Sequence, residues 1–426
     1  MKKILILLIN IIVYIRAKNA YDKLLEWGKN NSLFITDKLE MRYISENNRA
    51  YYAKDDIPEH TLLMTIPFKI MLNLKNAFEL LNSKKINKLY TEYKKNSTNI
   101  SVGFFTANDD QTFLSYLVYL VNHRQKQYKK NKFYQYFQYL FDTFETNLDS
   151  YPLFYNANQM KLLRGSVTYM DVTLMRELFE DEKISFEQDY NQKEIDIDEY
   201  MRYRTLIIAK TLNISQLSVI PFIDLFENDP MDFNVDIGLN ETNNNINVFT
   251  TKKVRRGDAL YIRSGYISNY KRLILYGQTF DKMSDYIDSF SIPMISFKMR
   301  KNMRITNEDF DVSESLDLAQ KKFYKKALKT YKKLSLLKKE DGSDLSAYKL
   351  FLRNLEMNRK EYEPVTTSDI YKEFVHLKDV NNVRRVLELE TRLFDQKIKL
   401  MKRLVDNMSK RLEKEKNKNN NNNTDL

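Results

Sequence analysis

The chain has 426 residues, with a hydrophobic fraction of 43% and an aromatic fraction of 13%, which suffices for one large buried core or two moderate ones. It contains no cysteine, so disulfides, cysteine-ligated zinc and a thiol nucleophile are excluded. The net charge is +12, from 69 basic and 57 acidic residues. Both signs are interspersed along the chain, which indicates solvated helix faces and does not favour a nucleic-acid surface.

Two common classes of ligand motif are missing from the sequence. Its 8 glycines form neither GxxxxGK[ST] nor GxGxxG, which argues against P-loop and Rossmann nucleotide binding. The three histidines, His60, His123 and His376, are far apart and none lies in an HExxH pattern. The sequence therefore predicts no metal site.

The first residues have the layout of a secretory signal peptide. Lys2 and Lys3 precede an apolar run over 4–15, and small residues follow at Ala17 and Ala20. The run is shorter than the ~20 residues that a membrane span needs. We predict a signal peptide over 1–17, entry into the secretory pathway or the extracellular space, and no plastid transit peptide. An uncleaved anchor and a buried helix are the alternatives.

Hydrophobic periodicity predicts mixed secondary structure in the first half of the chain. A stretch rich in phenylalanine and tyrosine over 133–141 has i, i+3, i+4 spacing, which indicates helical core packing more than a platform for stacking bases. The expected elements are a helix over 21–30, strands over 49–53 and 61–67, and helices over 76–88, 112–144, 158–179 and 195–212.

In the second half, an asparagine-rich polar loop is expected over 232–247, followed by two strand pieces over 248–263. A turn at Arg255-Arg256-Gly257-Asp258 joins these pieces. From 316 onward the pattern is helical, and an amphipathic stripe from Leu393 to Leu412 would pack on neighbouring helices or, alternatively, face a partner. The tail over 413–426 is predicted to be disordered.

Several short motifs follow one another in a recognisable order. Together they resemble the SET-domain protein-lysine methyltransferases of the RuBisCO large-subunit methyltransferase type. The resemblance implies an α+β fold: a SET-domain β-fold over 18–290, interrupted by a helical insertion over 75–215, and then an all-α domain over 291–412 like that family's substrate-binding domain. The motifs are Tyr21 to Trp27, Ala53 with Asp56-Ile57, Leu62 to Pro67, Leu163 to Ser166, Val219 to Pro221 with Asp224-Leu225, Gly257-Asp258, Ser268-Asn269 and Tyr276-Gly277.

The resemblance implies S-adenosylmethionine as the cofactor, but the residues that would hold it depart from the family pattern. The G-x-G of the family falls on Asn48-Arg49-Ala50, where added Cβ atoms hinder close approach to the backbone. The Asn-His pair falls on Glu227-Asn228. An ionised glutamate only accepts hydrogen bonds, although it can accept one from an amine, whereas asparagine also donates. A shift of one residue would let Asn228-Asp229 act as an approximate substitute.

The catalytic tyrosine of the family falls on Ser264, which is too short to place its hydroxyl where a phenol would lie. Misplacement by ~1 Å can cost on the order of 100-fold in rate. Tyr261 and Tyr266 are possible substitutes, and simple packing is the other interpretation of both.

The three departures together favour a pseudoenzyme that acts as a protein-binding module. The alternative is an active S-adenosylmethionine-dependent protein-lysine methyltransferase with a reshaped site, and a third hypothesis is a basic helical binding protein. The expected partner is a protein, or a lysine-containing protein substrate. We expect no metal, no nucleic acid and no stable membrane span after signal cleavage.

Overall fold

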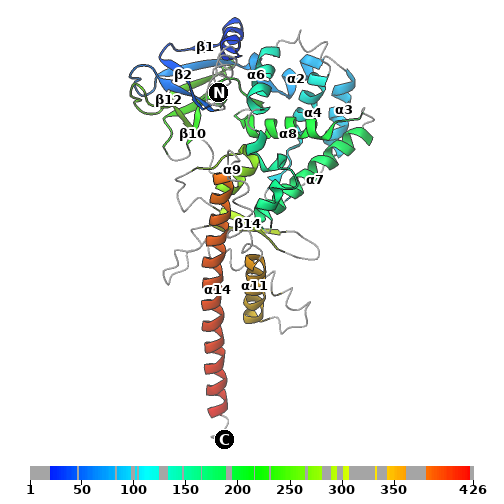
Figure 1. The fold of residues 1–426 in the computed structure, drawn as a ribbon, viewed down its shortest axis with the longest axis vertical. Coiled ribbons are helices and arrows are strands. Elements are labelled where there is room, and N and C mark those ends of the chain that lie inside the picture. The colour runs from blue at the N-terminus through cyan, green and yellow to red at the C-terminus, as the bar shows by residue number, and fades with distance from the viewer. Residues whose placement is uncertain are drawn as a thin grey trace, which may run out of the picture. The chain divides into compact units, whose positions relative to one another are not determined.

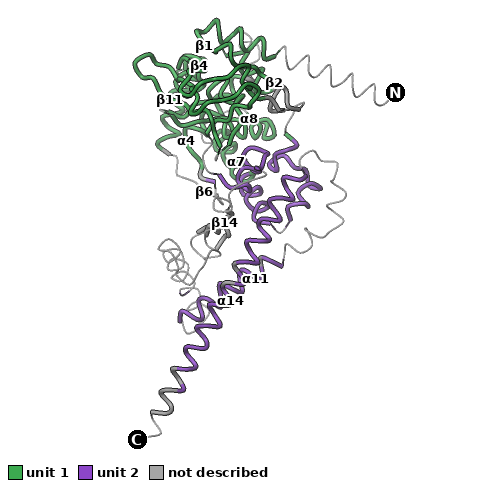
Figure 2. Tube along the Cα trace, turned by 90° about the vertical axis from the view of Figure 1, so that its left-hand side faces the viewer, with its two compact units in different colours: residues 1–101, 106–148, 176–266 green, residues 102–105, 149–175, 267–426 purple. Residues whose placement is uncertain are grey.

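The computed structural model divides into two compact units, which are described separately (Figure 2). The first comprises 1–101, 106–148 and 176–266, and the second comprises 102–105, 149–175 and 267–426. The predicted signal peptide lies outside the described residues, and the domain limits drawn from the sequence stay a prediction. The structure describes residues 20–45, 48–81, 84–96, 101–102, 105–123, 133–145, 148–164, 166–188, 194–214, 216–229, 232–263, 267–280, 289–294, 301–306, 332, 343–360 and 380–422.

A six-stranded sheet forms the β part of the first unit and lies to one side of its helices (Figure 1). Its order is β1-β4-β12-β11-β13-β10. Strand β13 lies between β11 and β10 and is parallel to both, whereas the other neighbours are antiparallel. The strands are β1 (Phe34–Ile35), β4 (Leu62–Pro67), β12 (Asn245–Thr250), β11 (Val235–Asn240), β13 (Tyr261–Arg263) and β10 (Glu227–Asp229).

The polar loop expected over 232–247 is wrong, because most of this segment is a β-hairpin. Strands β11 and β12 pair from Val235 opposite Thr250 to Asn240 opposite Asn245. Apolar residues alternate along both strands, and Ile246 and Val248 are fully buried. This alternation places the apolar side chains on the buried face of the sheet, which favours strands despite the asparagine content. The asparagines serve the turn, where Asn244 adopts φ 51°, a conformation that asparagine tolerates.

The described residues also form smaller β elements, and the strands predicted over 49–53 and 61–67 are present. β2 (Leu39–Ser45) pairs with β3 (Asn48–Ala53), and β9 (Leu217–Val219) pairs with both β5 (Leu72–Asn73) and β8 (Thr211–Asn213). Two further short strands are β6 (Ser101–Val102) and β7 (Phe105–Thr106).

Helices fill the insertion between the two halves of the sheet. The stretch 133–141 packs into the core as predicted: Phe133, Tyr136 and Phe137 are buried, and the Trp27 ring from the helix over 20–30 stacks on Tyr136 with centroids 5.9 Å apart. The helices are α2 (Leu74–Leu81), α3 (Lys84–Asn96), α4 (Asp109–His123), α6 (Tyr134–Glu145), α7 (Val167–Gln188) and α8 (Ile197–Lys210), with 3-10 turns η1 (Phe68–Ile70), η2 (Leu148–Ser150), η3 (Pro152–Phe154), η4 (Gln159–Leu163) and η5 (Ile223–Leu225).

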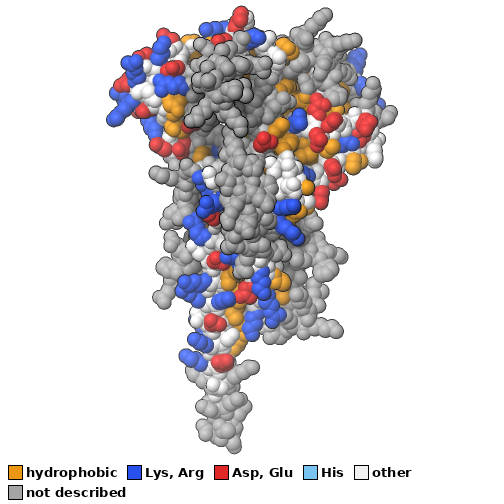
Figure 3. Space-filling model, in the orientation of Figure 1, with side chains coloured by type: hydrophobic (Ala, Val, Ile, Leu, Met, Phe, Trp, Pro, Cys, Tyr) orange, Lys and Arg blue, Asp and Glu red, His pale blue; other side chains and the backbone are white. Residues whose placement is uncertain are grey.

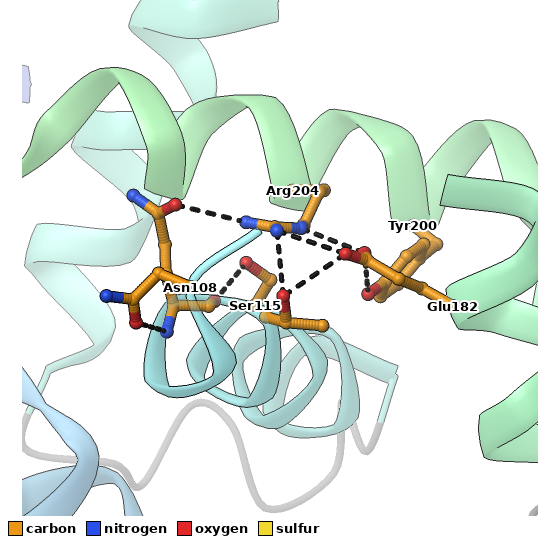
Figure 4. A network of polar contacts seen from close by, with 7 residues as sticks. Asn108, Ser115, Glu182, Tyr200 and Arg204 are labelled. Carbon is orange, nitrogen blue, oxygen red and sulfur yellow. Dashed lines mark hydrogen bonds and ion pairs between the residues drawn. The ribbon is translucent and has the colours of Figure 1, made fainter. Parts of the chain in front are cut away.

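A buried ion pair joins three of these helices (Figure 4). The Arg204 guanidinium on α8 is 0% exposed and donates to both carboxylate oxygens of Glu182 on α7, at 2.9 and 3.1 Å. Tyr200 also donates to Glu182, at 2.9 Å, and Arg204 donates to Thr112 on α4, at 2.8 Å. Breaking such a pair by removing one partner costs about 3–5 kcal/mol, so this contact fixes the relative placement of α4, α7 and α8.

The described residues of the second unit are mostly helical, and they include the hairpin of β14 (Ser289–Met294) and β15 (Lys301–Thr306). Its C-terminal helices are α9 (Asn269–Tyr276), α11 (Asp344–Lys360) and α14 (Val380–Asn422). The stripe predicted to pack on a neighbouring helix does so: Phe394 and Met401 are fully buried, and α11 lies beside α14. Helix α14 includes residues 413–422, where disorder was predicted; lysine and glutamate, which are good helix formers, dominate the first part of this segment, up to 418.

The described surface is mixed in charge, as the sequence predicts. Lysine and arginine side chains alternate with acidic ones over the face shown in Figure 3. Among the described residues, no helix is long and apolar enough to cross a membrane. No cluster of three potential metal ligands occurs in that part of the chain either.

Two buried carboxylates lie close together in the second unit. Glu390 on α14 is 0% exposed and accepts hydrogen bonds at the start of α7, from the Val167 and Thr168 amides at 3.2 and 3.3 Å and from the Thr168 hydroxyl at 2.6 Å. Asp171, one turn along α7, has its Oδ2 buried without a hydrogen-bond partner in the described structure. Burial raises the pKa of Asp171 to about 8. The nearby charge of Glu390 adds to this increase, whereas that of Lys271 opposes it.

We predict that Asp171→Asn makes the protein relatively more stable as the pH rises. The folded carboxyl binds a proton up to about pH 8 but the unfolded one releases it near ~3.9, so wild-type stability falls between these pH values by about 1.4 kcal/mol per unit. Urea unfolding of both proteins from pH 5 to pH 9 should show a stability difference that grows to about pH 8 and then levels. A difference that stays constant with pH would contradict the assignment.

Candidate functional site

Three segments that carry predicted site residues meet beside strand β13. The Leu260 amide donates to the Tyr51 carbonyl at 2.9 Å, and the Leu260 carbonyl accepts from the Glu227 amide at 3.1 Å. Leu260, at the entry to β13, is therefore hydrogen-bonded to both β3 and β10. Tyr52 bridges Ala259 in antiparallel register, so β3 runs beside the segment that leads into β13.

A tight turn sets the approach to β13. Gly257 adopts φ +89°, a conformation that glycine reaches without strain. Two backbone hydrogen bonds join the turn to strand β3. The Ala53 amide donates to the Asp258 carbonyl at 2.9 Å, and the Gly257 amide donates to the Ala53 carbonyl at 2.7 Å. The predicted Gly257-Asp258 turn is thus the device that folds the chain back along β3.

Glu227 and Tyr261 form the polar pair of the site. They lie opposite each other on the parallel strands β10 and β13, so their side chains share a face of the sheet. The Tyr261 phenol and the Glu227 carboxylate lie close enough for each to shift the pKa of the other. Burial raises the pKa of Glu227, and the Tyr261 phenol lowers it in part. Burial and then the Glu227 charge raise the pKa of Tyr261.

The surroundings of this pair are acidic and aromatic. Tyr52 and Asp229 are both close enough to raise the pKa of Tyr261, and both are partly exposed. The Arg42 guanidinium lies 4.7 Å from the centroid of the Tyr52 ring and is paired with Glu40 at 2.8 Å. A half-buried carboxylate beside phenol rings suits a cationic group better than an anionic one.

The other predicted residues are distributed unevenly. Ala50 is 0% exposed, and Asn228 is exposed and alternates to the face opposite Glu227. Asn48 and Arg49 belong to β3, but their side chains lie outside the described part of the structure. Ser264 and Tyr266 also lie outside the described residues. Of the predicted site residues, the structure brings together Glu227 and Tyr261.

Sequence analysis missed Asn234, which contacts the Tyr261 strand from the opposite side to β10. Its side-chain Oδ1 accepts from the Tyr261 amide at 2.7 Å, and its Nδ2 donates to the Ala259 carbonyl at 2.9 Å. It is 7% exposed. An asparagine within an asparagine-rich segment gives little signal; its place directly before the alternating residues of β11 is the one clue.

The described residues fit S-adenosylmethionine poorly. Glu227 stands where the family has an asparagine, supplies no amide donor, and lies opposite Tyr261. Asn228, which could supply an amide after a shift of one residue, alternates to the other face. The Ala50 methyl group is enclosed in the core where a glycine would leave room.

We predict that Glu227→Gln lowers the phenol pKa of Tyr261, because it removes the negative charge that opposes phenol ionisation. The measurement is a pH titration of ¹³Cζ-tyrosine by NMR, with Tyr261→Phe used to assign the signal. Glu59→Gln is the matched control, since Glu59 is exposed and pairs with His60 on the surface at 3.4 Å. An unchanged Tyr261 titration in Glu227→Gln would show that the pair is not formed in solution.

The comparisons with known proteins identify the fold. No family model and no curated protein matches the sequence. Solved structures do match: "Structure of Rubisco LSMT bound to Sinefungin and Monomethyllysine" has a TM-score of 0.62, 13% identity, and coverage of 90% of this chain and 92% of that chain. "Crystal structure of the SET domain of LSMT bound to Lysine and AdoHcy" has a TM-score of 0.58, 11% identity, and coverage of 90% and 92%.

A third structure, "Structure of Rubisco LSMT bound to AdoMet", gives a TM-score of 0.57, 13% identity, and coverage of 90% of this chain and 93% of that chain. Identities of this size establish the fold and leave the chemistry to the residues of this chain. The predicted fold class is confirmed: over 90% of its length the chain has the SET-containing α+β fold of Rubisco LSMT.

Proposed function

We propose that this protein is a SET-fold binding module with little or no methyl-transfer activity, and that it holds a lysine-bearing segment of a protein partner. The observation that carries the proposal is the Glu227–Tyr261 pair on β10 and β13. A carboxylate placed there beside a phenol is an acceptor for an ammonium group, and charge-assisted bonds of this kind are about twice as strong as neutral ones.

The position of β10 supports access by a partner. It forms one edge of the six-stranded sheet, and Glu227, Asp229 and Tyr261 are all partly exposed. A lysine side chain could bring its ammonium to the Glu227 carboxylate while its apolar stem lies along a tyrosine ring. Arg263 stands opposite Asp229 on β13, so selection of a basic segment would rest on the Glu227 carboxylate.

The same residues disfavour methyl transfer. Transfer from S-adenosylmethionine requires the sulfonium methyl and the lysine nitrogen to be aligned, and alignment errors of ~1 Å are costly. The carboxyl of Glu227 lies close to Tyr261, Ala50 adds a buried methyl group, and Ser264 replaces the family's tyrosine. These are the three motifs that would have to position the cofactor and the amine.

The second candidate is an active S-adenosylmethionine-dependent protein-lysine methyltransferase with a reshaped site. Tyr261 favours it, because its phenol lies on the strand that enters the site and is close to a carboxylate. If Tyr261 took the place of the missing phenol, Asn228 would have to contact the cofactor from the other face of β10.

The structural neighbours are described as bound to lysine, to monomethyllysine and to AdoMet or AdoHcy. We propose that this chain has kept a lysine-binding role and lost the cofactor role. Action in the secretory pathway or outside the cell is part of the proposal, and it depends on the signal-like N-terminus.

We predict that calorimetry detects no micromolar binding of S-adenosylmethionine, and that labelled cofactor transfers no methyl group to protein lysine. A degenerate peptide pool with a fixed central lysine should bind, whereas the same pool with norleucine at that position should not. Glu227→Gln should weaken lysine-pool binding roughly ten-fold, the effect of losing one charge-assisted bond, and Glu59→Gln should leave it unchanged. Micromolar cofactor binding with methyl incorporation would instead support the active enzyme.

A further inference from the structure

Strand β13 is too short for its hydrogen bonds to the neighbouring strands to fix the position of Tyr261. It has 3 residues and carries the phenol of the candidate site at its first position. On one side it pairs with β10, and on the other it meets β11 at a single register position, Val235 opposite Ile262. Additional contacts must therefore set where Tyr261 lies.

One residue, Asn234, bonds both backbone polar groups of Tyr261. The side-chain Oδ1 of Asn234 accepts from the Tyr261 amide at 2.7 Å, and the Asn234 amide donates to the Tyr261 carbonyl at 2.9 Å. The Asn234 side chain also donates to the Ala259 carbonyl at 2.9 Å. Its amide group thus acts as an extra peptide unit that prolongs the ladder beyond the end of β11.

Asn234 is itself held from two directions. It is buried, at 7% exposure, and its carbonyl accepts from the Thr251 amide at 2.9 Å. The next residue, Val235, is the first of β11 and is fully buried opposite Thr250. The hairpin β11–β12 therefore fixes the position of Asn234, and the hydrogen bonds of Asn234 in turn fix the backbone of Tyr261.

We propose that Asn234 is the positioning residue of the site: it holds the Tyr261 backbone so that the phenol meets Glu227. Aspartate, serine or alanine at this position would each lose at least one of the two side-chain bonds. The inference rests on the proposed function for its biological meaning, but the placement of Tyr261 can be measured without any ligand.

The test measures the phenol pKa of Tyr261 by ¹³Cζ-tyrosine NMR in wild type, Asn234→Ala and Asn234→Asp. Asn234→Ala should lower this pKa toward its ordinary value, because the phenol leaves Glu227 and its buried surroundings. Asn234→Asp keeps the acceptor for the Tyr261 amide and should keep the phenol pKa at or above the wild-type value. Asn240→Ala, at the far end of β11 in an exposed turn, is the matched control and should change nothing.

A folded Asn234→Ala protein with an unchanged Tyr261 titration would overturn the proposal, even if it unfolds more easily. If that variant does not fold, amide hydrogen exchange of wild type decides the question. The Tyr261 amide should be protected like that of Ile262, and rapid exchange of the Tyr261 amide would show that Asn234 does not hold it. Binding of the central-lysine peptide pool separates the two claims. If wild type binds no peptide, the proposed function fails, while the pKa shift still tests the positioning role.

Discussion

The candidate site depends on how one three-residue strand is held. Strand β13 places Tyr261 between β10, which carries Glu227, and the end of β11, where Asn234 begins the hairpin. The segment before it is bonded to β3 through Leu260. Each neighbour contributes only a few hydrogen bonds, and each bond is worth about 1 kcal/mol net. The geometry of the polar pair is therefore the joint product of three segments that are distant in sequence.

Burial gives this arrangement its chemical character. Desolvation raises the pKa of both Glu227 and Tyr261, and the nearby phenol offsets part of the cost for the carboxylate. A pair of this kind gains most from a cation that supplies the missing positive charge. The local electrostatics therefore suit a lysine ammonium better than a cofactor that needs amide donors.

Much of the fold could be predicted from the sequence, because the helices, the strands of β3 and β4 and the Gly257 turn follow from hydrophobic period and turn chemistry. The β11–β12 hairpin was missed because asparagine outweighed the alternating apolar residues in the pattern, although alternation decides which face is buried. Within the site, Glu227 and Tyr261 could be singled out from motif position. Their pairing could not, since the register between β10 and β13 arises only from tertiary contacts. Asn234 and the buried Arg204–Glu182 pair were likewise invisible, because polar residues show their partners only once the chain has folded.

The central claim is that the Glu227–Tyr261 pair receives an amine and not S-adenosylmethionine. Its most direct test is NMR mapping of the amides of β10 and β13 during separate titrations with the central-lysine peptide pool and with S-adenosylmethionine. The account predicts that the peptide shifts the signals of Glu227 and Tyr261, and that the cofactor leaves them unmoved. Saturable shifts at these residues with micromolar cofactor, and none with the peptide, would contradict it.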